Sequence, residues 1–327
     1  MSTTQKTKEP TTTTATLDNA DGGGEDLVKI TFSFASRLLS HHKKVSLLQR
    51  ILSFHETKNP KHYIDLRSSS KLFRNALQPP PLWTTFPHSN HATLQSLLDR
   101  LEQLRGDEES SGNVPSVLFI EEGEHDARWS HPTTPTSFQN YVTVKIPLSI
   151  YGAGREKTTL VGVGLRIKGK KSNGIVKIED LTIQEGKGCG LLAEEGMNVR
   201  MKRISILECG WQGVFAHNAD ISCNDLQVIS CGLSGVSAYG SVIITLRGMG
   251  TNIQRNGTIG YDGSYGLQTS GPSAKLQLVA PLVKEIISIN NGSGGNWGGK
   301  KGSTIDQVDN DGIVLQILYK GEIEDDY

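Results

Sequence analysis

The chain has few aromatic residues, few cysteines and no excess of charge of either sign. Phe, Trp and Tyr make up 6% of the 327 residues, and 34 basic side chains balance 34 acidic ones. Because a net charge of zero gives no general attraction to polyanions, we expect no nucleic-acid partner. The low aromatic content, together with 36 glycines, favours a turn-rich β architecture over a helical bundle.

Long apolar runs are also missing. No stretch approaches the length of about 18 apolar residues that a membrane-spanning helix needs, so we expect no membrane partner. Residues 1–26 lack the apolar core of a secretory signal, and their Thr, Gly and charged residues predict a disordered polar tail. Four cysteines without such a signal are typical of reduced thiols. The sequence therefore predicts an intracellular protein, cytoplasmic or nuclear.

Two kinds of hydrophobic periodicity divide the rest of the chain. Residues 27–106 carry apolar residues at helical spacing, and the last such stripe ends at Gly106, a residue typical of helix C-termini. Beyond it the pattern changes to short β-rich runs bounded by Gly and Pro. We therefore predict a helical region over 27–106, a β-region over 107–320 and an acidic tail over 321–327.

A phrase that begins with glycine and continues into a short apolar strand recurs through the β-region. Because such a repeat buries its apolar face only by stacking on its neighbours, the recurrence predicts a solenoid. The pattern of leucine-rich repeats is missing, so we expect stacked parallel β-coils about 4.8 Å apart. The leading glycines are Gly164, Gly190, Gly213, Gly235 and Gly266.

Aligning "EDLTI", "KRISI" and "NDLQV" places three charged residues in one column. Asp180, Arg203 and Asp225 then follow one another in successive coils, and their alternating sign avoids repulsion between neighbours. The column beside them consists of Glu179, Lys202 and Asn224.

The same alignment places Cys209, Cys231 and Asn256 at equivalent turns of consecutive coils. A solenoid exposes strand edges at both ends and needs caps. We expect the helix around Leu94–Leu104 to cover the first end. The Gly-rich "NNGSGGNWGGKKG" and the strand "IVLQILY" would finish the other.

The start of the β-region resembles that of a known fold family. "TLQSLLDRL", "SVLFIEEGEH" and "VKIPLSIYGAGREKTTLVG" cover about residues 92–162. They are similar to the capping helix, first strand and Gly turn of the pectin-esterase and pectate-lyase type right-handed β-helix proteins. The resemblance implies a mainly β chain folded as a right-handed parallel β-helix solenoid. It says little about chemistry, because one fold hosts many functions.

Residues 44–87 resemble an F-box, through "VSLLQRILSF", "YIDLRSSSKLFRNAL" and "PPPLWTTF". The resemblance implies an N-terminal α-helical, F-box-like region that binds a ubiquitin-ligase adaptor protein. The alternative is a small helical cap packed against the solenoid, since apolar stripes usually belong to a core. The partner-binding residues would be Leu48, Ile51, Leu52, Leu66, Phe73, Leu82 and Trp83.

Catalytic motifs of pectin esterases and polygalacturonases are not found. The nearest approximation to a lyase site combines Arg203, Asp225, Asp220 and His217. A ladder of neutralised charges is the alternative interpretation of these residues. His and Cys residues do not occur at the spacings of metal ligands, so we expect no metal and no cofactor.

The stretch "RGMGTNIQRNGTIGYDGSY" is interpreted as a long insertion in the fourth coil. Loops carried on a rigid scaffold often hold recognition residues, although a flexible segment without a role is the alternative. The candidate anchors are Arg247, Arg255, Tyr261, Asp262 and Tyr265.

These observations leave two main functional hypotheses, and a purely structural or assembly role is a third possibility. The first is a non-enzymatic intracellular binding or scaffold protein with a β-helix recognition surface, which in its most specific form is an F-box-type substrate receptor of a ubiquitin ligase. The alternative is a carbohydrate-active polysaccharide lyase or hydrolase of the pectate-lyase-like fold, whose partner is a glycan.

Overall fold

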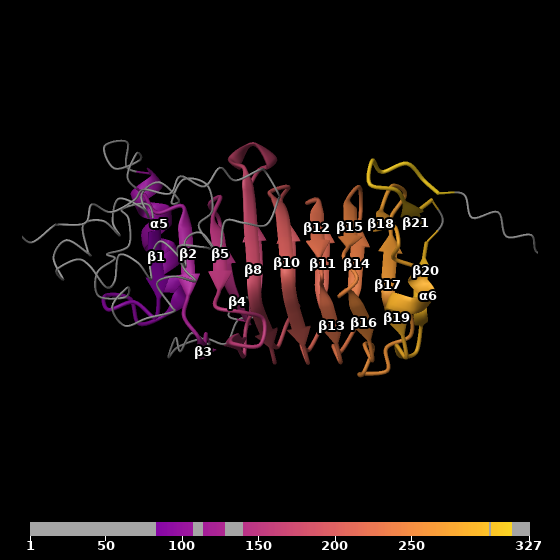
Figure 1. Cartoon of the computed structure of the whole chain (residues 1–327), viewed down its shortest axis with the longest axis horizontal. Coiled ribbons are helices and arrows are strands. Elements are labelled where there is room, and N and C mark those ends of the chain that lie inside the picture. Colours follow the sequence, from indigo (N-terminus) through magenta and orange to yellow (C-terminus); the bar gives the residue numbers. More distant parts are fainter. Residues whose placement is uncertain (1–82, 107–113, 128–139, 301, 316–327) are drawn as a thin grey trace, which may run out of the picture. The chain divides into compact units, whose positions relative to one another are not determined.

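The structure is a computed structural model that describes residues 83–106, 114–127, 140–300 and 302–315, all of which belong to the unit Ile64–Tyr327. This part of the chain is mainly β, with two parallel sheets and few helices (Figure 1). The helices are α5 (Leu94–Gly106), the single-turn η3 (Lys171–Asn173) and α6 (Lys284–Ile287).

The strands visit three faces in a fixed order, which recurs in each coil. The 14-stranded sheet forms faces A and B, and the seven-stranded sheet forms face C. Face A consists of β2 (Val117–Ile120), β5 (Ser149–Gly152), the first halves of β8 (Ile175–Gln184) and β10 (Asn198–Leu207), β12 (Ile221–Asn224), β15 (Ile243–Arg247), β18 (Lys275–Val279) and β21 (Thr304–Val308). Face B consists of β3 (Gly123–Asp126), β6 (Thr158–Val161), the second halves of β8 and β10, β13 (Gln227–Ile229), β16 (Asn252–Gln254) and β19 (Ser288–Ile289). Face C consists of β4 (Tyr141–Val144), β7 (Gly164–Lys168), β9 (Leu191–Glu194), β11 (Val214–His217), β14 (Val236–Tyr239), β17 (Tyr265–Ser270) and β20 (Gly295–Gly299).

Strands of the same face pair in parallel from one coil to the next. On face A, Val199 of β10 lies opposite Val176 of β8 and Ile221 of β12. On face C, β11 pairs with β9 on one side and β14 on the other. The predicted stacking of equivalent strands is confirmed, and the arrangement is consistent with the predicted solenoid.

The core lies between the three faces and repeats with the coils. One inward position of face A shows this, because its register carries a buried apolar side chain in every coil from β2 to β18. Burying each aliphatic side chain fully contributes about 1.5–3 kcal/mol. This column consists of Leu118, Ile150, Ile178, Met201, Cys223, Leu246 and Leu278.

The bend between faces A and B carries the predicted charge column. Asp180, Arg203 and Asp225 all have left-handed backbone there, with φ values of 61°, 52° and 58°. The Arg203 guanidinium donates Nε to Asp180 Oδ1 at 2.5 Å and Nη2 to Oδ2 at 2.7 Å. Asp225 follows in the next coil, where its Oδ1 accepts the backbone N–H of Gly250 at 2.9 Å. The column is therefore confirmed, with the ion pair formed on the Asp180 side.

The leading glycines stand where face C begins, and other atoms lie close to the position that a Cβ would take. A Cβ on Gly213 would press into the Val228 side chain of its own coil and lie 2.7 Å from the backbone oxygen of Gly235. A Cβ on Gly190 would lie 2.9 Å from the oxygen of Gly213. Side chains never approach so closely, so these positions require glycine.

The turn between faces B and C holds a ladder of side chains. Cys209 and Cys231 follow one another there, and each thiol donates to the backbone oxygen two residues before it, that of Leu207 at 3.6 Å and that of Ile229 at 3.9 Å. Asn256 occupies the next coil, where its Oδ1 accepts the N–H of Cys231 at 3.0 Å and its Nδ2 donates to Asn291 Oδ1 at 3.0 Å. The predicted equivalence of the three turns is confirmed, and Asn291 extends it by one coil.

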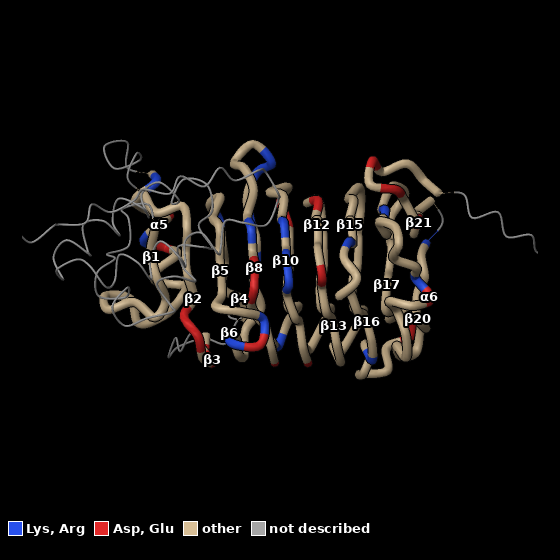
Figure 2. Tube along the Cα trace, viewed as in Figure 1, with Lys and Arg blue, Asp and Glu red and all other residues tan. Residues whose placement is uncertain are grey.

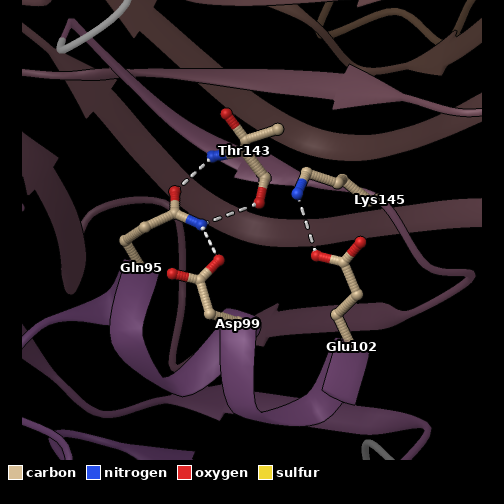
Figure 3. Close-up of polar contacts among 5 residues, drawn as sticks. All are labelled: Gln95, Asp99, Glu102, Thr143 and Lys145. Carbon is tan, nitrogen blue, oxygen red and sulfur yellow. Dashed lines mark hydrogen bonds and ion pairs between the residues drawn. The ribbon is translucent and has the colours of Figure 1, made fainter. Parts of the chain in front are cut away.

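Helix α5 covers the first end of face C, as predicted (Figure 3). Strand β4 is an edge strand. The side chain of Gln95 satisfies the backbone of this edge strand in place of a neighbouring strand. Its Oε1 accepts the N–H of Thr143 at 2.7 Å, and its Nε2 donates to the backbone oxygen of Thr143 at 3.3 Å. Asp99 orients that amide at 2.8 Å, and Lys145 pairs with Glu102 at 3.0 Å. The helix residues in the core are Leu94, Leu97, Leu98 and Leu101.

The other end of the stack carries β20 and β21 (Figure 1). The Gly-rich segment forms β20, whose Trp297 packs against the core with the Lys284 ammonium 5.2 Å from its ring centre. Val314 forms only an antiparallel bridge with Val308. Ile313 and Leu315 beside it are described but form no strand, and residues 316–319 of the predicted final strand lie outside the described residues.

The prediction of an F-box-like segment is wrong at the segment's C-terminal end. Trp83 begins strand β1 (Trp83–Phe86), which pairs in parallel with β2, and it packs on a small cluster formed by Val117, Phe119 and Tyr151. This residue therefore belongs to the β-structure and not to a helical adaptor site. The other predicted adaptor contacts lie outside the described residues: Leu48, Ile51, Leu52, Leu66, Phe73 and Leu82.

Candidate functional site

The four predicted catalytic residues do not gather in one place. Arg203 and Asp225 stand at the bend between faces A and B. His217 ends β11 on face C, and Asp220 lies just before β12. The Asp220 Oδ1 accepts the N–H of Ile243 at 2.9 Å. The residues thus occupy two corners of the coil.

The Arg203 corner has the properties of a structural ladder. Its guanidinium is bound by the buried Asp180 carboxylate and lies 3.7 Å from Glu179. The hydrogen bond with Asp180 raises the pKa of Arg203 above its usual value. Arg203 therefore keeps its proton and does not serve as a base. Arg155 adds a hydrogen bond of 2.6 Å to the backbone oxygen of Asp225.

Face C presents two rows of outward side chains that run along the stack. In most strands they alternate with buried residues, as a pleated strand requires, although Ser237 and Ser270 are themselves buried. The first row is Thr143, Arg166, Leu192, Phe215, Ser237 and Gln268. The second row is Lys168, Glu194, His217, Tyr239 and Ser270.

Aromatic rings gather at the centre of face C. The Phe215 and His217 rings are stacked with centres 6.5 Å apart, and Tyr239 stands edge-on to His217 at 5.2 Å. Tyr239 is 47% exposed, and Trp211, in the turn that leads into β11, is 51% exposed. We call Trp211, Phe215, His217 and Tyr239 the aromatic platform. Aromatic faces of this kind offer apolar contact area with a polar rim.

Charged groups border the aromatic platform on one side. Glu194 lies directly opposite His217 in the register, and the Arg166 Nε donates to its Oε1 at 2.6 Å. Lys168 ends the same row and pairs with Glu195 at 3.0 Å. On the exposed side, the Asn218 Nδ2 lies 3.4 Å from the His217 Nε2. The rings of the aromatic platform therefore lie next to a carboxylate, that of Glu194, and on the same face as two cations, Arg166 and Lys168.

The predicted recognition loop is divided by a strand. Residues 252–254 form β16, and only residues 257–264 extend the turn beyond the length seen in the preceding coil. Gln268 of face C fixes this segment by donating to the Gly263 oxygen at 2.9 Å. Tyr261 is 66% exposed on it, beside Asp262, which is also exposed.

The three other loop candidates lie elsewhere in the coil. Arg247 ends β15 on face A, and Arg255 occupies the turn between faces B and C with a φ of 56°. Tyr265 begins β17, where its ring covers the backbone of Gly298. The extended turn therefore carries only Tyr261 and Asp262 of the predicted set.

The four cysteines are buried and unpaired. Burial raises the pKa of Cys189 to about 11, and it also raises the pKa of Cys223. Buried thiols of this kind are poor nucleophiles. Cys209 and Cys231 serve the turn ladder.

Within the described ranges, no three His, Cys, Asp or Glu side chains are grouped so that they could hold a metal ion. The helices of these same ranges are too short and too polar to cross a membrane. The aromatic platform combines partly exposed rings with the outward carboxylate of Glu194.

Comparisons with known proteins return little. No family model matches the chain, and no curated protein matches it. Among solved structures, the chain is similar to the catalytic domain of a GH87 alpha-1,3-glucanase in complex with tetrasaccharides, at 16% identity and a TM-score of 0.37. The match covers 68% of this chain and 40% of that one. At these values the likeness carries no argument about activity.

The first functional hypothesis is nevertheless corrected. Trp83, the one described residue of the predicted adaptor site, belongs to parallel strand β1 and not to a helical F-box region. The solved structure named above is a glucanase and not an F-box protein. The intracellular location and the protein partner stay predictions.

Sequence reasoning found His217 but missed its neighbours. The signal was present in the repeated phrases "GLLAE", "GVFAH" and "GVSAY", whose last residues are Glu194, His217 and Tyr239. Their register shows that these residues stand side by side. The phrases predict the repeat length, but they do not by themselves show that their last residues form one outward row.

Proposed function

We propose that this chain is a carbohydrate-active enzyme, built on a right-handed parallel β-helix, that binds a polysaccharide across face C. The observation that carries the proposal is the aromatic platform, where the half-exposed Tyr239 contacts the rings of Phe215 and His217, and the half-exposed Trp211 stands in the turn that leads into the same strand. Sugar rings have apolar faces that pack on aromatic rings, while their hydroxyls bond polar groups at the rim.

The groups around the platform favour an elimination over a hydrolysis. Hydrolysis uses two carboxylates that flank the scissile bond. In the described strands of face C, Glu194 is the one outward carboxylate, and Arg166 already binds it. Elimination needs instead a base that removes the proton next to a sugar carboxylate, and an acid for the leaving oxygen. His217 and Tyr239 lie side by side and have the chemistry for these roles.

An elimination also needs cations for the carboxylate of the sugar. Arg166 and Lys168 are the outward cations of the same sheet. Lys168 is partly exposed, and its pair with Glu195 is therefore weak enough to exchange for a ligand carboxylate. The proposed substrate is thus a polysaccharide that contains uronic acid residues.

The experiment is a screen of polyuronides and neutral glycans that follows binding by affinity electrophoresis and cleavage by the ultraviolet absorbance of unsaturated products. We expect Tyr239→Ala and Trp211→Ala each to weaken binding of the recognised glycan about tenfold or more, since buried aromatic anchors dominate such contacts.

The control is Ile286→Ala, which removes a more exposed apolar side chain from α6. It should bind as the wild type does. Equal affinities of the two platform variants and the wild type would remove the proposal, and so would binding of no glycan in the screen. Release of reducing ends without the ultraviolet signal would overturn the elimination.

A further inference from the structure

Face A carries a row of cations that have no acidic partner. Their side chains point outward and are exposed, and none of them takes part in an ion pair within the described ranges. We call these residues the cationic strip; blue segments on β8, β10 and β15 follow part of it (Figure 2). The strip consists of Lys177, Arg200, Lys202, Arg247 and Lys275.

The register places two of these cations directly against each other. Lys177 of β8 lies opposite Arg200 of β10, at the spacing of about 4.8 Å between neighbouring strands. Like charges in opposite positions destabilise a sheet. In the neighbouring column, one cation lies opposite an acidic residue: Lys202 lies opposite Glu179. The strip therefore keeps a positive potential that an anion would neutralise.

Most of the other outward residues on these strands are neutral hydrogen-bonding groups; the exceptions are Glu179 and the apolar Ile175 and Ile243. Ser222 and Thr245 continue the column of Arg200, and Asn224 lies between Lys202 and Arg247. No aromatic side chain faces outward on β8, β10, β12, β15 or β18 of face A. Strips that bind single-stranded nucleic acids offer rings for base stacking, which this one lacks.

We propose that the cationic strip is a second polysaccharide-binding surface, which holds an anionic glycan chain lying along the stack, outside the site on face C. Charge complementarity selects the ligand, because cations on β8, β10, β15 and β18 match a linear polymer that carries an anionic group on its sugars. The inference rests on the proposed function for the nature of the polymer. The inference adds to the proposed function a surface on face A that binds the polymer, separate from the catalytic site on face C.

The test compares dextran sulfate with uncharged dextran, which share a backbone and differ in charge. Dextran sulfate contains no uronic acid, so elimination does not consume it. We expect K177Q/R200Q to weaken dextran sulfate binding about tenfold at low salt, because two charge contacts are lost. Rising salt should weaken the binding by the wild type and reduce the difference between the two proteins.

The matched control is K187Q/R255Q, which also removes two exposed cations but from the turn between faces B and C. It should bind as the wild type does. An equal loss in both double variants, no loss in K177Q/R200Q, or wild-type dextran binding as tight as dextran sulfate binding would overturn the strip. Tighter binding of a single-stranded DNA oligomer through the same residues would overturn the assignment to a glycan.

Failure of this inference is separable from failure of the proposed function. Tyr239→Ala should leave dextran sulfate binding unchanged, because Tyr239 belongs to face C. If the strip variant alone weakens binding while the platform variants bind the screened glycans normally, the strip stands and the proposed function falls. The opposite result removes the strip and keeps the platform.

Discussion

Gly213→Ala should lower the free energy of unfolding by about 3 kcal/mol. A single methyl group has this effect because the Cβ would press into the Val228 side chain and lie 2.7 Å from the Gly235 oxygen. Neither atom can retreat, since Val228 is fully buried and the Gly235 oxygen accepts the Val214 N–H of the stacked strand at 2.9 Å. Overpacking of a filled core costs about 1–3 kcal/mol. Urea unfolding followed by circular dichroism would measure it.

The matched control is Gly106→Ala at the end of α5, where a Cβ would meet nothing within 4 Å. That change should leave stability within about 0.5 kcal/mol of the wild type, as surface changes usually do. If both substitutions change the free energy of unfolding equally little, the leading glycines are not required by the close approach of neighbouring coils.

His217→Ala should abolish most of the turnover while the glycan still binds. Removal of a general acid or base slows catalysis by about 10²–10⁴-fold. Binding should persist, because Tyr239 and Trp211 remain exposed on the platform. The measurement is the initial rate of unsaturated product formation on the polyuronide found in the screen, together with the affinity of the same variant for that polymer.

His88→Ala serves as the control, because it removes a histidine that pairs with His91 next to β1, away from the strands of face C. Its turnover should equal that of the wild type. Full activity of the His217 variant would assign the base to another residue. Loss of rate and affinity in equal proportion would make His217 a binding group only.

The sequence predicted the part of the fold that depends on repetition. Equivalent residues of successive repeats touch, so the spacing of the leading glycines was enough to align Cys209 with Cys231 and Asp180 with Arg203. Helix α5 could also be predicted, because its leucine stripe has the helical period and stops at a glycine.

The candidate site could be predicted only in part. Outward residues are not marked by hydrophobic periodicity, so Tyr239 and Glu194 gained meaning only when the register placed them beside His217. Conversely, Arg203 and Asp225 stood out by charge, yet charge alone does not distinguish a catalytic group from a corner ladder. The Gln95 clasp on β4 was missed because side-chain pairing with an edge strand leaves no pattern in the sequence.

The most direct test of this account is to locate a bound oligosaccharide by crystallography, using a cleavage product of the polymer identified in the screen and the His217→Ala variant to prevent turnover. The account predicts a sugar ring against Tyr239 and Phe215 on face C, with a carboxylate near Lys168. An oligosaccharide bound at another surface, with face C bare, would contradict it.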